Sequence, residues 1–139
     1  MRLLALTLLI LPLGATAQNI DAAWCVAAST ATANQLATEA NDERLSLVAR
    51  KILSREASEY YAAAVVHSRL APAASKGDRS YMAGFQRAED QHKLEVAEVC
   101  LARSKEVLKG MSSDDSLQVY AESIGLARGY APYLVRASK

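Results

Sequence analysis

Apolar residues recur at spacings of three and four along most of this chain, and no segment alternates between apolar and polar residues with a period of two. A spacing of three and four places side chains on one face of an α-helix, whereas a strand needs the shorter period. The chain is also rich in Ala, Glu, Arg and Leu, which favour helices, and it has only three prolines. The sequence therefore predicts an all-α fold.

Breaks in the pattern divide the chain into three long helices and a shorter C-terminal fourth. Pro72 ends the second helix, because the residue before a proline is pushed out of the helical region, and Gly110 ends the third. Helices joined by short connections pack as antiparallel neighbours, so we expect one up-down helical bundle. The predicted helices cover about residues 21–40, 42–71, 78–109 and 112–129.

The apolar stripe of each helix predicts the face that the helix buries. In the first helix this face comprises Trp24, Cys25, Ala28, Thr32 and Leu36. In the second it comprises Leu45, Val48, Ile52, Tyr60, Ala63, Val66 and Leu70. In the third it comprises Tyr81, Phe85, Ala88, Val96, Val99 and Val107. In the fourth it comprises Leu117, Tyr120, Ala121 and Ile124.

The first 17 residues have the pattern of a secretory signal peptide. Arg2 precedes an apolar run that ends at Leu13, and Ala15-Thr16-Ala17 supplies the small residues of a cleavage site. The run is shorter than the ~20 residues that cross a bilayer, although a retained anchor is the alternative. We expect cleavage after Ala17, which leaves a single helical domain of residues 18–139 in the periplasm or, alternatively, outside the cell.

Export would place the only two cysteines, Cys25 and Cys100, in an oxidising compartment, where thiols pair. In an up-down-up arrangement the two positions lie at similar heights along the bundle, given a rise of about 1.5 Å per residue. We therefore predict one disulfide between the first and third helices. Two buried, unpaired thiols are the alternative.

The charge balance limits the classes of partner. Removal of Arg2 leaves as many basic as acidic residues, whereas nucleic-acid-binding proteins normally carry a basic excess. No later apolar run approaches the length of a membrane span, so we expect none in the mature chain. The expected partner is another envelope or extracellular protein, and the oligomeric state is left open.

Five residues of the second and third helices form a candidate metal site. Glu89 and His92 have the Glu-x-x-His spacing of carboxylate-bridged di-metal sites in helical bundles, and Glu56 falls in the apolar stripe of its helix. Such a site would hold iron, manganese or zinc. The complete motif needs two Glu-x-x-His helices and this chain has one. The alternatives are a buried Glu56–His92 ion pair, or acids that Arg55 and Lys93 draw to the surface. The candidate ligands are Glu56, Glu59, Glu89, His92 and Glu95.

Three other side chains suggest binding. His67 and Met82 lie at similar distances from the loop between the second and third helices, and a His/Met pair can ligate haem iron. The chain lacks a Cys-x-x-Cys-His attachment motif, so a core methionine beside an interfacial histidine is the simpler interpretation. Tyr61 points away from its stripe, and aromatic residues with a polar tip favour interfaces. We expect Tyr61 to be exposed and to mark a contact with a partner.

No catalytic residues are predicted. The chain has no Gly-rich phosphate loop, no His-Glu-x-x-His motif and no serine in a strained nucleophile turn. The sequence thus predicts a non-enzymatic, exported module without a cofactor that binds or protects another protein, as inhibitors, immunity proteins and stress chaperones do. In the chaperone variant, protonation of its 15 acids at low pH opens the bundle by charge repulsion. A metal-binding carboxylate/histidine bundle is the alternative, and a purely structural envelope protein is a third interpretation.

Overall fold

The computed structural model describes Ile20, residues 22–71 and residues 90–130, with the side chains of residues 90–92 and 128–130 left out. Within this part of the chain there are four helices and no strand, which confirms the all-α prediction. The predicted signal peptide and the start of the predicted third helix lie outside the described residues. The helices are α1 (Ala22–Ala40), α2 (Leu47–Leu70), α4 (Asp90–Lys109) and α5 (Ser113–Tyr130).

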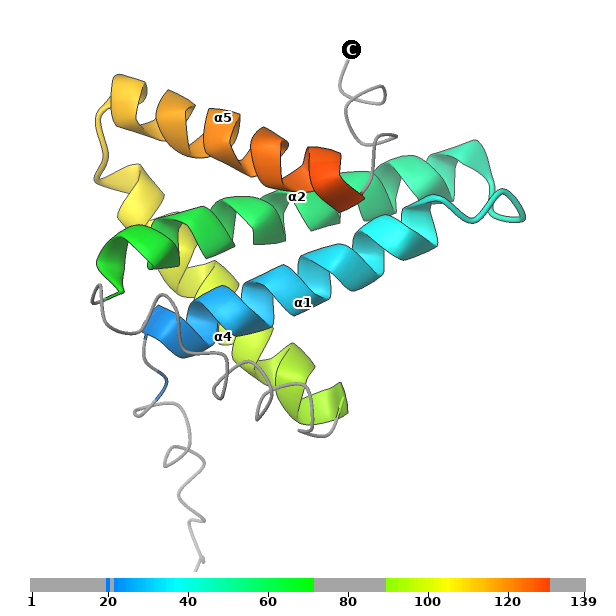
Figure 1. Cartoon of the computed structure of the whole chain (residues 1–139), viewed down its shortest axis with the longest axis horizontal. Coiled ribbons are helices and arrows are strands. Elements are labelled where there is room, and N and C mark those ends of the chain that lie inside the picture. Colours follow the sequence, from blue (N-terminus) through cyan, green and yellow to red (C-terminus); the bar gives the residue numbers. More distant parts are fainter. Residues whose placement is uncertain (1–19, 21, 72–89, 131–139) are drawn as a thin grey trace, which may run out of the picture.

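The helices pack around α2. α1 and α2 form an antiparallel hairpin, α5 lies along α2 in the opposite direction, and α4 crosses behind both members of the hairpin (Figure 1). The predicted up-down order therefore holds from α1 to α2, whereas α4 crosses the hairpin instead of running alongside it. None of the described helices has the length and apolar character needed to span a membrane.

α2 is buried along most of its second half and is more exposed at its start. Every residue of α2 from Tyr60 to His67 is buried, because α1, α4 and α5 all pack against α2. The first turns of α2 are covered less, and the expected inner residues Val48 and Ile52 are 68% and 53% exposed. Leu45 and Leu70 are exposed as well. The buried residues of α1 all have small side chains, which allows α1 and α2 to approach closely. They are Cys25, Ala27, Ala28, Ser29, Ala33, Ala37 and Ala40.

The start of α2 differs from the prediction by five residues. Ser46 caps the helix, because its Oγ accepts a hydrogen bond of 3.2 Å from the backbone N–H of Ala49. Asp42, expected at the helix start, instead holds Arg44 in the connecting loop, with an oxygen–nitrogen distance of 2.7 Å. The hydrogen bonds from Arg44 lower the pKa of Asp42 to about 2. A charged turn therefore separates the two helices of the hairpin.

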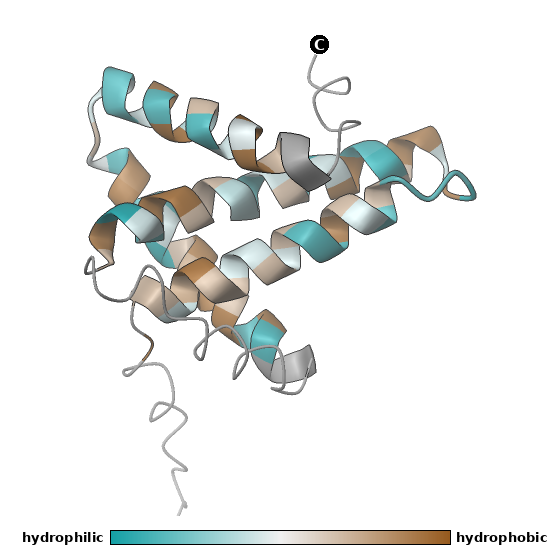
Figure 2. Ribbon diagram, viewed as in Figure 1, coloured by the Kyte–Doolittle hydropathy of each residue, from teal (hydrophilic) through white to brown (hydrophobic). Residues whose placement is uncertain are grey.

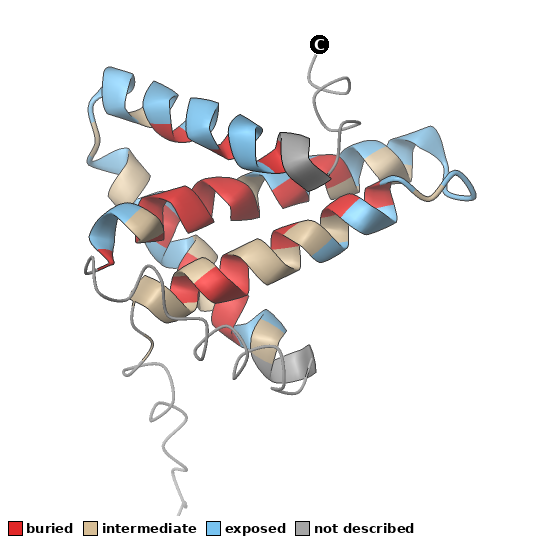
Figure 3. Cartoon of the chain, viewed as in Figure 1, coloured by how far each residue is buried: buried red, intermediate tan, exposed pale blue. Residues whose placement is uncertain are grey.

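α5 buries a different face from the one expected. Val119, Ser123 and Ala127 are buried, whereas the predicted inner residues Leu117 and Tyr120 are 67% and 51% exposed. Ile124 and Ala121 are exposed too. Figure 3 shows the buried residues of α5 on the side that faces α2. Val119 packs there against Ala62, Val65 and Val66, and short side chains at this interface let α5 lie close to α2.

The predicted disulfide between Cys25 and Cys100 is confirmed. It joins the first turn of α1 to the middle of α4, with an S–S bond of 2.05 Å and 5.3 Å between the Cα atoms. Both cysteines are completely buried. One turn further along α4, Nη1 of Arg103 donates a hydrogen bond of 2.7 Å to the backbone carbonyl of Ile20. Two links thus hold the beginning of α1 against α4.

Candidate functional site

The described members of the predicted carboxylate–histidine site do not form a cluster. Glu56 and Glu95 are exposed, so the prediction that Glu56 lies within a buried stripe is wrong. Glu59 forms an ion pair of 2.9 Å with Lys105 of α4. Among the described residues, no three of these predicted ligands lie close enough together to hold a metal ion. Glu89 and the side chain of His92 lie outside them, so the complete ligand set stays a prediction.

Tyr61 is buried, and the expectation of an exposed contact residue is wrong. Only 1% of it is exposed, and its hydroxyl donates a hydrogen bond of 2.7 Å to Oδ1 of Asn34 on α1. The small residues of α1 leave room for the ring between the helices of the hairpin. The polar tip is satisfied within the protein, so this side chain has a structural role.

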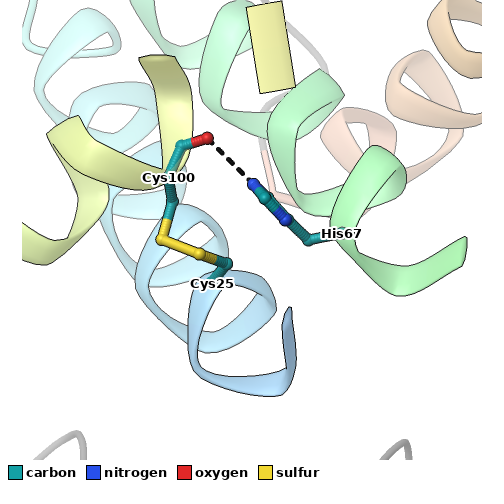
Figure 4. A group of neighbouring side chains, drawn as sticks. All are labelled: Cys25, His67 and Cys100. Atoms are coloured by element: carbon teal, nitrogen blue, oxygen red, sulfur yellow. Dashed lines mark hydrogen bonds between the residues drawn. A yellow bond between two sulfur atoms is a disulfide. The ribbon is translucent and has the colours of Figure 1, made fainter. Parts of the chain in front are cut away.

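His67 lies buried in the last turn of α2, beside the disulfide (Figure 4). Its Nε2 is 2.9 Å from the backbone carbonyl oxygen of Cys100. Because a carbonyl oxygen only accepts, Nε2 carries the proton of this hydrogen bond. Burial lowers the pKa of His67; the Cys100 hydrogen bond opposes this shift, and the charge of Arg103 adds to it. Met82 lies outside the described residues, so the haem pair is not tested.

A groove opens where α4 and α5 diverge over α2. It has a volume of about 340 Å³. α2 forms its floor, Tyr120 contributes the α5 wall, and Leu101 and Leu108 belong to the α4 wall. Its lining residues are Arg55, Ser58, Glu59, Ala62, Leu101, Ser104, Lys105, Leu108 and Tyr120.

Exposed apolar side chains extend this groove at both sides. Leu117 and Ile124 lie three and four residues from Tyr120, on the same side of α5. Val48 and Ile52 precede Arg55 by seven and three residues and continue the face of α2 that forms the floor. Figure 2 shows hydrophobic residues along α5 and at the start of α2. The groove and these residues together are called the α2/α4/α5 surface below.

The polar groups of the groove are largely satisfied by the protein itself. The hydroxyl of Ser58 donates to the carbonyl of Ser54, and that of Ser104 donates to the carbonyl of Leu101, with distances of 2.9 and 2.8 Å. Glu59 pairs with Lys105 and more distantly with Arg55, at 3.7 Å. The lining carries two positive side chains and one negative one, so one positive charge is not balanced within it. The groove therefore combines apolar walls with a positive edge.

A larger hollow of about 630 Å³ lies between α1 and the beginning of α4. Its described lining contains only two large aliphatic side chains, so it offers less apolar surface to a partner. The lining residues are Ala31, Thr32, Gln35, Leu36, Glu39, Lys93 and Leu94.

The sequence did not reveal the α2/α4/α5 surface, because the largest apolar residues of α5 were expected inside. A usable signal was the spacing of Val119, Ser123 and Ala127, which places three short side chains on one face at intervals of four. Such a face suits close packing on the equally small residues of α2. Comparison of the chain with protein-family models, curated proteins and solved structures finds no match in any of the three. Its function must therefore be argued from its own residues.

Proposed function

We propose that this chain is an exported, non-enzymatic module that binds another protein through the α2/α4/α5 surface. The observation that carries the proposal is the orientation of α5, which exposes Leu117, Tyr120 and Ile124 while it buries shorter side chains. Contiguous exposed apolar side chains of this size mark sites of interaction. Export is supported by the N-terminal signal pattern and is consistent with the disulfide.

The partner that fits this surface is an amphipathic helix with carboxylates along one edge. Apolar side chains of such a helix would lie on Tyr120, Leu101 and Leu108, in the helix-in-groove mode of recognition. Its carboxylates would meet Lys105 and Arg55, whose two positive charges are only half balanced by Glu59. From Val48 to Ala62 the floor is about 20 Å long, which matches a helix of about 14 residues.

The scaffold holds the walls of the groove in place before a partner arrives. The disulfide fixes α4 to α1. Arg69 of α2 forms an ion pair of 2.7 Å with Glu122, on the flank of α5 away from the groove. A surface prepared in this way loses little conformational entropy when it binds.

Two model peptides test the charge preference. Both would be amphipathic helices of about 14 residues with the same leucine face, one flanked by glutamates and the other by lysines. We expect the mature protein to bind the glutamate peptide at least about tenfold more tightly, by fluorescence anisotropy, and added salt to reduce the difference because it screens exposed charges. Equal affinity for both peptides would contradict the charge argument, and no binding of either would contradict the proposal.

A matched pair of substitutions locates the binding face. Ile124 and Leu126 are 45% and 44% exposed on α5, but Leu126 lies on the opposite flank of the helix, with Glu122. We expect Ile124→Ser to weaken binding of the glutamate peptide about tenfold, from the loss of buried apolar area, and Leu126→Ser to change it less than twofold. Equal effects of the two substitutions would place the binding face elsewhere.

A charge reversal tests the positive edge. Lys105→Glu leaves the apolar walls intact and changes the charge opposite the peptide. We expect this variant to bind the lysine peptide more tightly than the glutamate peptide. An unchanged preference would show that Lys105 does not face the bound helix.

A stress chaperone that opens in acid is a second candidate, favoured by one observation. His67 is buried and its lowered pKa favours the neutral ring, so its protonation opposes folding. Exposure of the apolar core at low pH would then protect aggregating clients. Light scattering of an aggregation-prone client between pH 2 and 7 tests this candidate, and a helical circular dichroism signal that is unchanged at pH 2 without client protection would eliminate it.

A further inference from the structure

The disulfide and His67 form a compact group of three potential metal ligands. One ring nitrogen of His67 and the sulfur atoms of Cys25 and Cys100 lie within 4.8 Å of one another, and all three residues are buried (Figure 4). The three come from the first turn of α1, the last turn of α2 and the middle of α4. We propose that the reduced protein binds one Zn²⁺ ion through Cys25, His67 and Cys100, and that the oxidised protein does not.

The hydrogen bond of His67 prepares the ring for this role. Nε2 donates to the carbonyl of Cys100, so in the neutral ring Nδ1 carries the lone pair. Metal-binding histidines typically donate their other ring N–H to a carbonyl or carboxylate, which fixes the tautomer and the orientation of the ring. The carbonyl belongs to one of the two cysteines, which couples the ring to the position of that cysteine.

The distances require only local movement. Zn–S bonds of about 2.3 Å in a tetrahedral site separate two sulfur atoms by about 3.8 Å. A covalent disulfide holds the two sulfurs closer than this, so they must move apart once the bond is reduced. One ring nitrogen of His67 already lies within 4.8 Å of both sulfur atoms. Three protein ligands leave one position of the tetrahedron open.

The reaction balances with a dithiol as the reductant. A thiolate of the dithiol attacks one sulfur of the Cys25–Cys100 bond, and its second thiol releases the reduced protein and becomes part of a new disulfide. The two electrons and two protons gained by the protein come from that dithiol. Zn²⁺ then replaces the two thiol protons, which leave to solvent, and accepts the lone pair of the imidazole.

Charge favours Zn²⁺ over the other common thiophilic ion, Cu⁺. Two thiolates and a neutral imidazole form an uncharged complex with Zn²⁺, whereas the same ligands carry one negative charge with Cu⁺. A net charge is costly at a site where both cysteines are completely buried. The neutral complex therefore suits this core better.

The position of Cys25 provides access. It is the fourth residue of α1, and the preceding residues Ala22, Ala23 and Trp24 are only half-buried. Once the bridge is opened, this end of the helix is the part that can separate from α4 without disrupting the rest of the hairpin. Both the reductant and the ion can enter by that movement.

Native mass spectrometry of the mature chain tests the proposal. The protein is reduced with a dithiol, freed of excess reductant without air, and mixed with Zn²⁺ or Cu⁺ in separate arms. We expect one Zn²⁺ per reduced chain, none per oxidised chain, and a rise in melting temperature with Zn²⁺ only after reduction. Co²⁺ in place of Zn²⁺ should give thiolate-to-metal charge-transfer absorption.

Two histidine variants identify the ligand. His67→Gln keeps an amide donor for the Cys100 carbonyl but lacks a metal-binding ring. Loss of an outer-shell partner alone costs about tenfold or more in metal affinity, so we expect loss of this ligand to lower the zinc affinity at least about tenfold. Circular dichroism of the oxidised variant checks that it folds. His92→Gln addresses the carboxylate site predicted from the sequence.

Four outcomes would overturn the proposal. They are equal zinc binding by oxidised protein, unchanged zinc affinity in His67→Gln, loss of zinc in His92→Gln with retention in His67→Gln, and binding of Cu⁺ without Zn²⁺. None of them bears on peptide binding by the α2/α4/α5 surface, because this site does not depend on that proposed function.

Discussion

Tyr61 and Asn34 join the two helices of the hairpin through a hydrogen bond of 2.7 Å between the phenol hydroxyl and Oδ1 of the amide. The bond lies in a region where α1 offers mostly alanine side chains, which provide little apolar area per residue. A large ring with a directed polar contact therefore fixes the register of α1 against α2, where packing of alanines alone specifies it weakly.

Replacement of Tyr61 by Phe tests how much this hydrogen bond contributes to the free energy of unfolding. We expect Tyr61→Phe to lower the free energy of unfolding by about 1 kcal/mol, since it removes one hydrogen bond and leaves the Asn34 oxygen with one partner fewer. Urea unfolding followed by circular dichroism measures the change. Tyr60→Phe, at the neighbouring buried position of α2, is the control. Burial, and after it Glu98, Glu56 and Glu59, raise the pKa of Tyr60, so its hydroxyl is uncharged in the folded protein at neutral pH. An equal loss in both variants would remove any special role for the Tyr61 bond.

The orientation of α5 predicts opposite sensitivities for two neighbouring positions. Val119 is completely buried and Leu117 is 67% exposed. Val119→Ala should lower the free energy of unfolding by about 2 kcal/mol, through lost burial and a cavity, whereas Leu117→Ala should change it by less than about 0.5 kcal/mol. Urea titrations of both variants measure this. A larger loss of unfolding free energy in Leu117→Ala than in Val119→Ala would instead support the orientation of α5 predicted from the sequence.

The disulfide should supply a large share of the stability. The double variant Cys25→Ala/Cys100→Ala opens a loop of 75 residues, and the chain-entropy account predicts a loss of about 4 kcal/mol. Thermal unfolding, compared with that of the oxidised parent, measures the loss. If the variant melts within a few degrees of the parent, helix packing alone holds α1 on α4.

His67 predicts a decrease in stability below neutral pH. Its folded-state pKa lies below its ordinary value of 6.5, so the unfolded chain takes up the proton first. Its contribution to stability is therefore fully present above pH 6.5 and is lost as the pH falls toward the lowered value. Urea midpoints between pH 7.5 and 5 should fall more steeply for the parent than for His67→Gln. Identical slopes would show that other groups, among them His92, govern this pH range.

The helices and the disulfide could be predicted because they depend on local signals. Pro72 and Gly110 interrupt the apolar pattern, and a chain with only two cysteines allows only one intramolecular pairing. The register of Cys25 and Cys100 then required only the helical rise. Their predicted similar heights assumed a third helix running alongside the first, whereas α4 crosses the hairpin (Figure 1). The predicted pairing holds because the two cysteines have no alternative partner in the chain.

The faces of α2 and α5 could not be predicted in the same way, because they depend on the distance between helices. The sequence pattern predicts burial of the largest apolar residues, yet the close approach of α5 to α2 selects Val119, Ser123 and Ala127 over the larger Leu117 and Ile124. Tyr61 was misplaced for the related reason that α1 has room for a ring. The candidate binding surface consists of the residues that this selection leaves outside.

A bridge between residues 25 and 100 also sets the order in which the protein matures. Cys100 is synthesised 75 residues after Cys25, which is a delay of roughly 4 to 15 s at common rates of translation. During that interval Cys25 has no partner in its own chain, since there is no third cysteine. The bond can close only when most of the polypeptide has emerged, so its oxidation reports that α1, α2 and α4 are all present in one place.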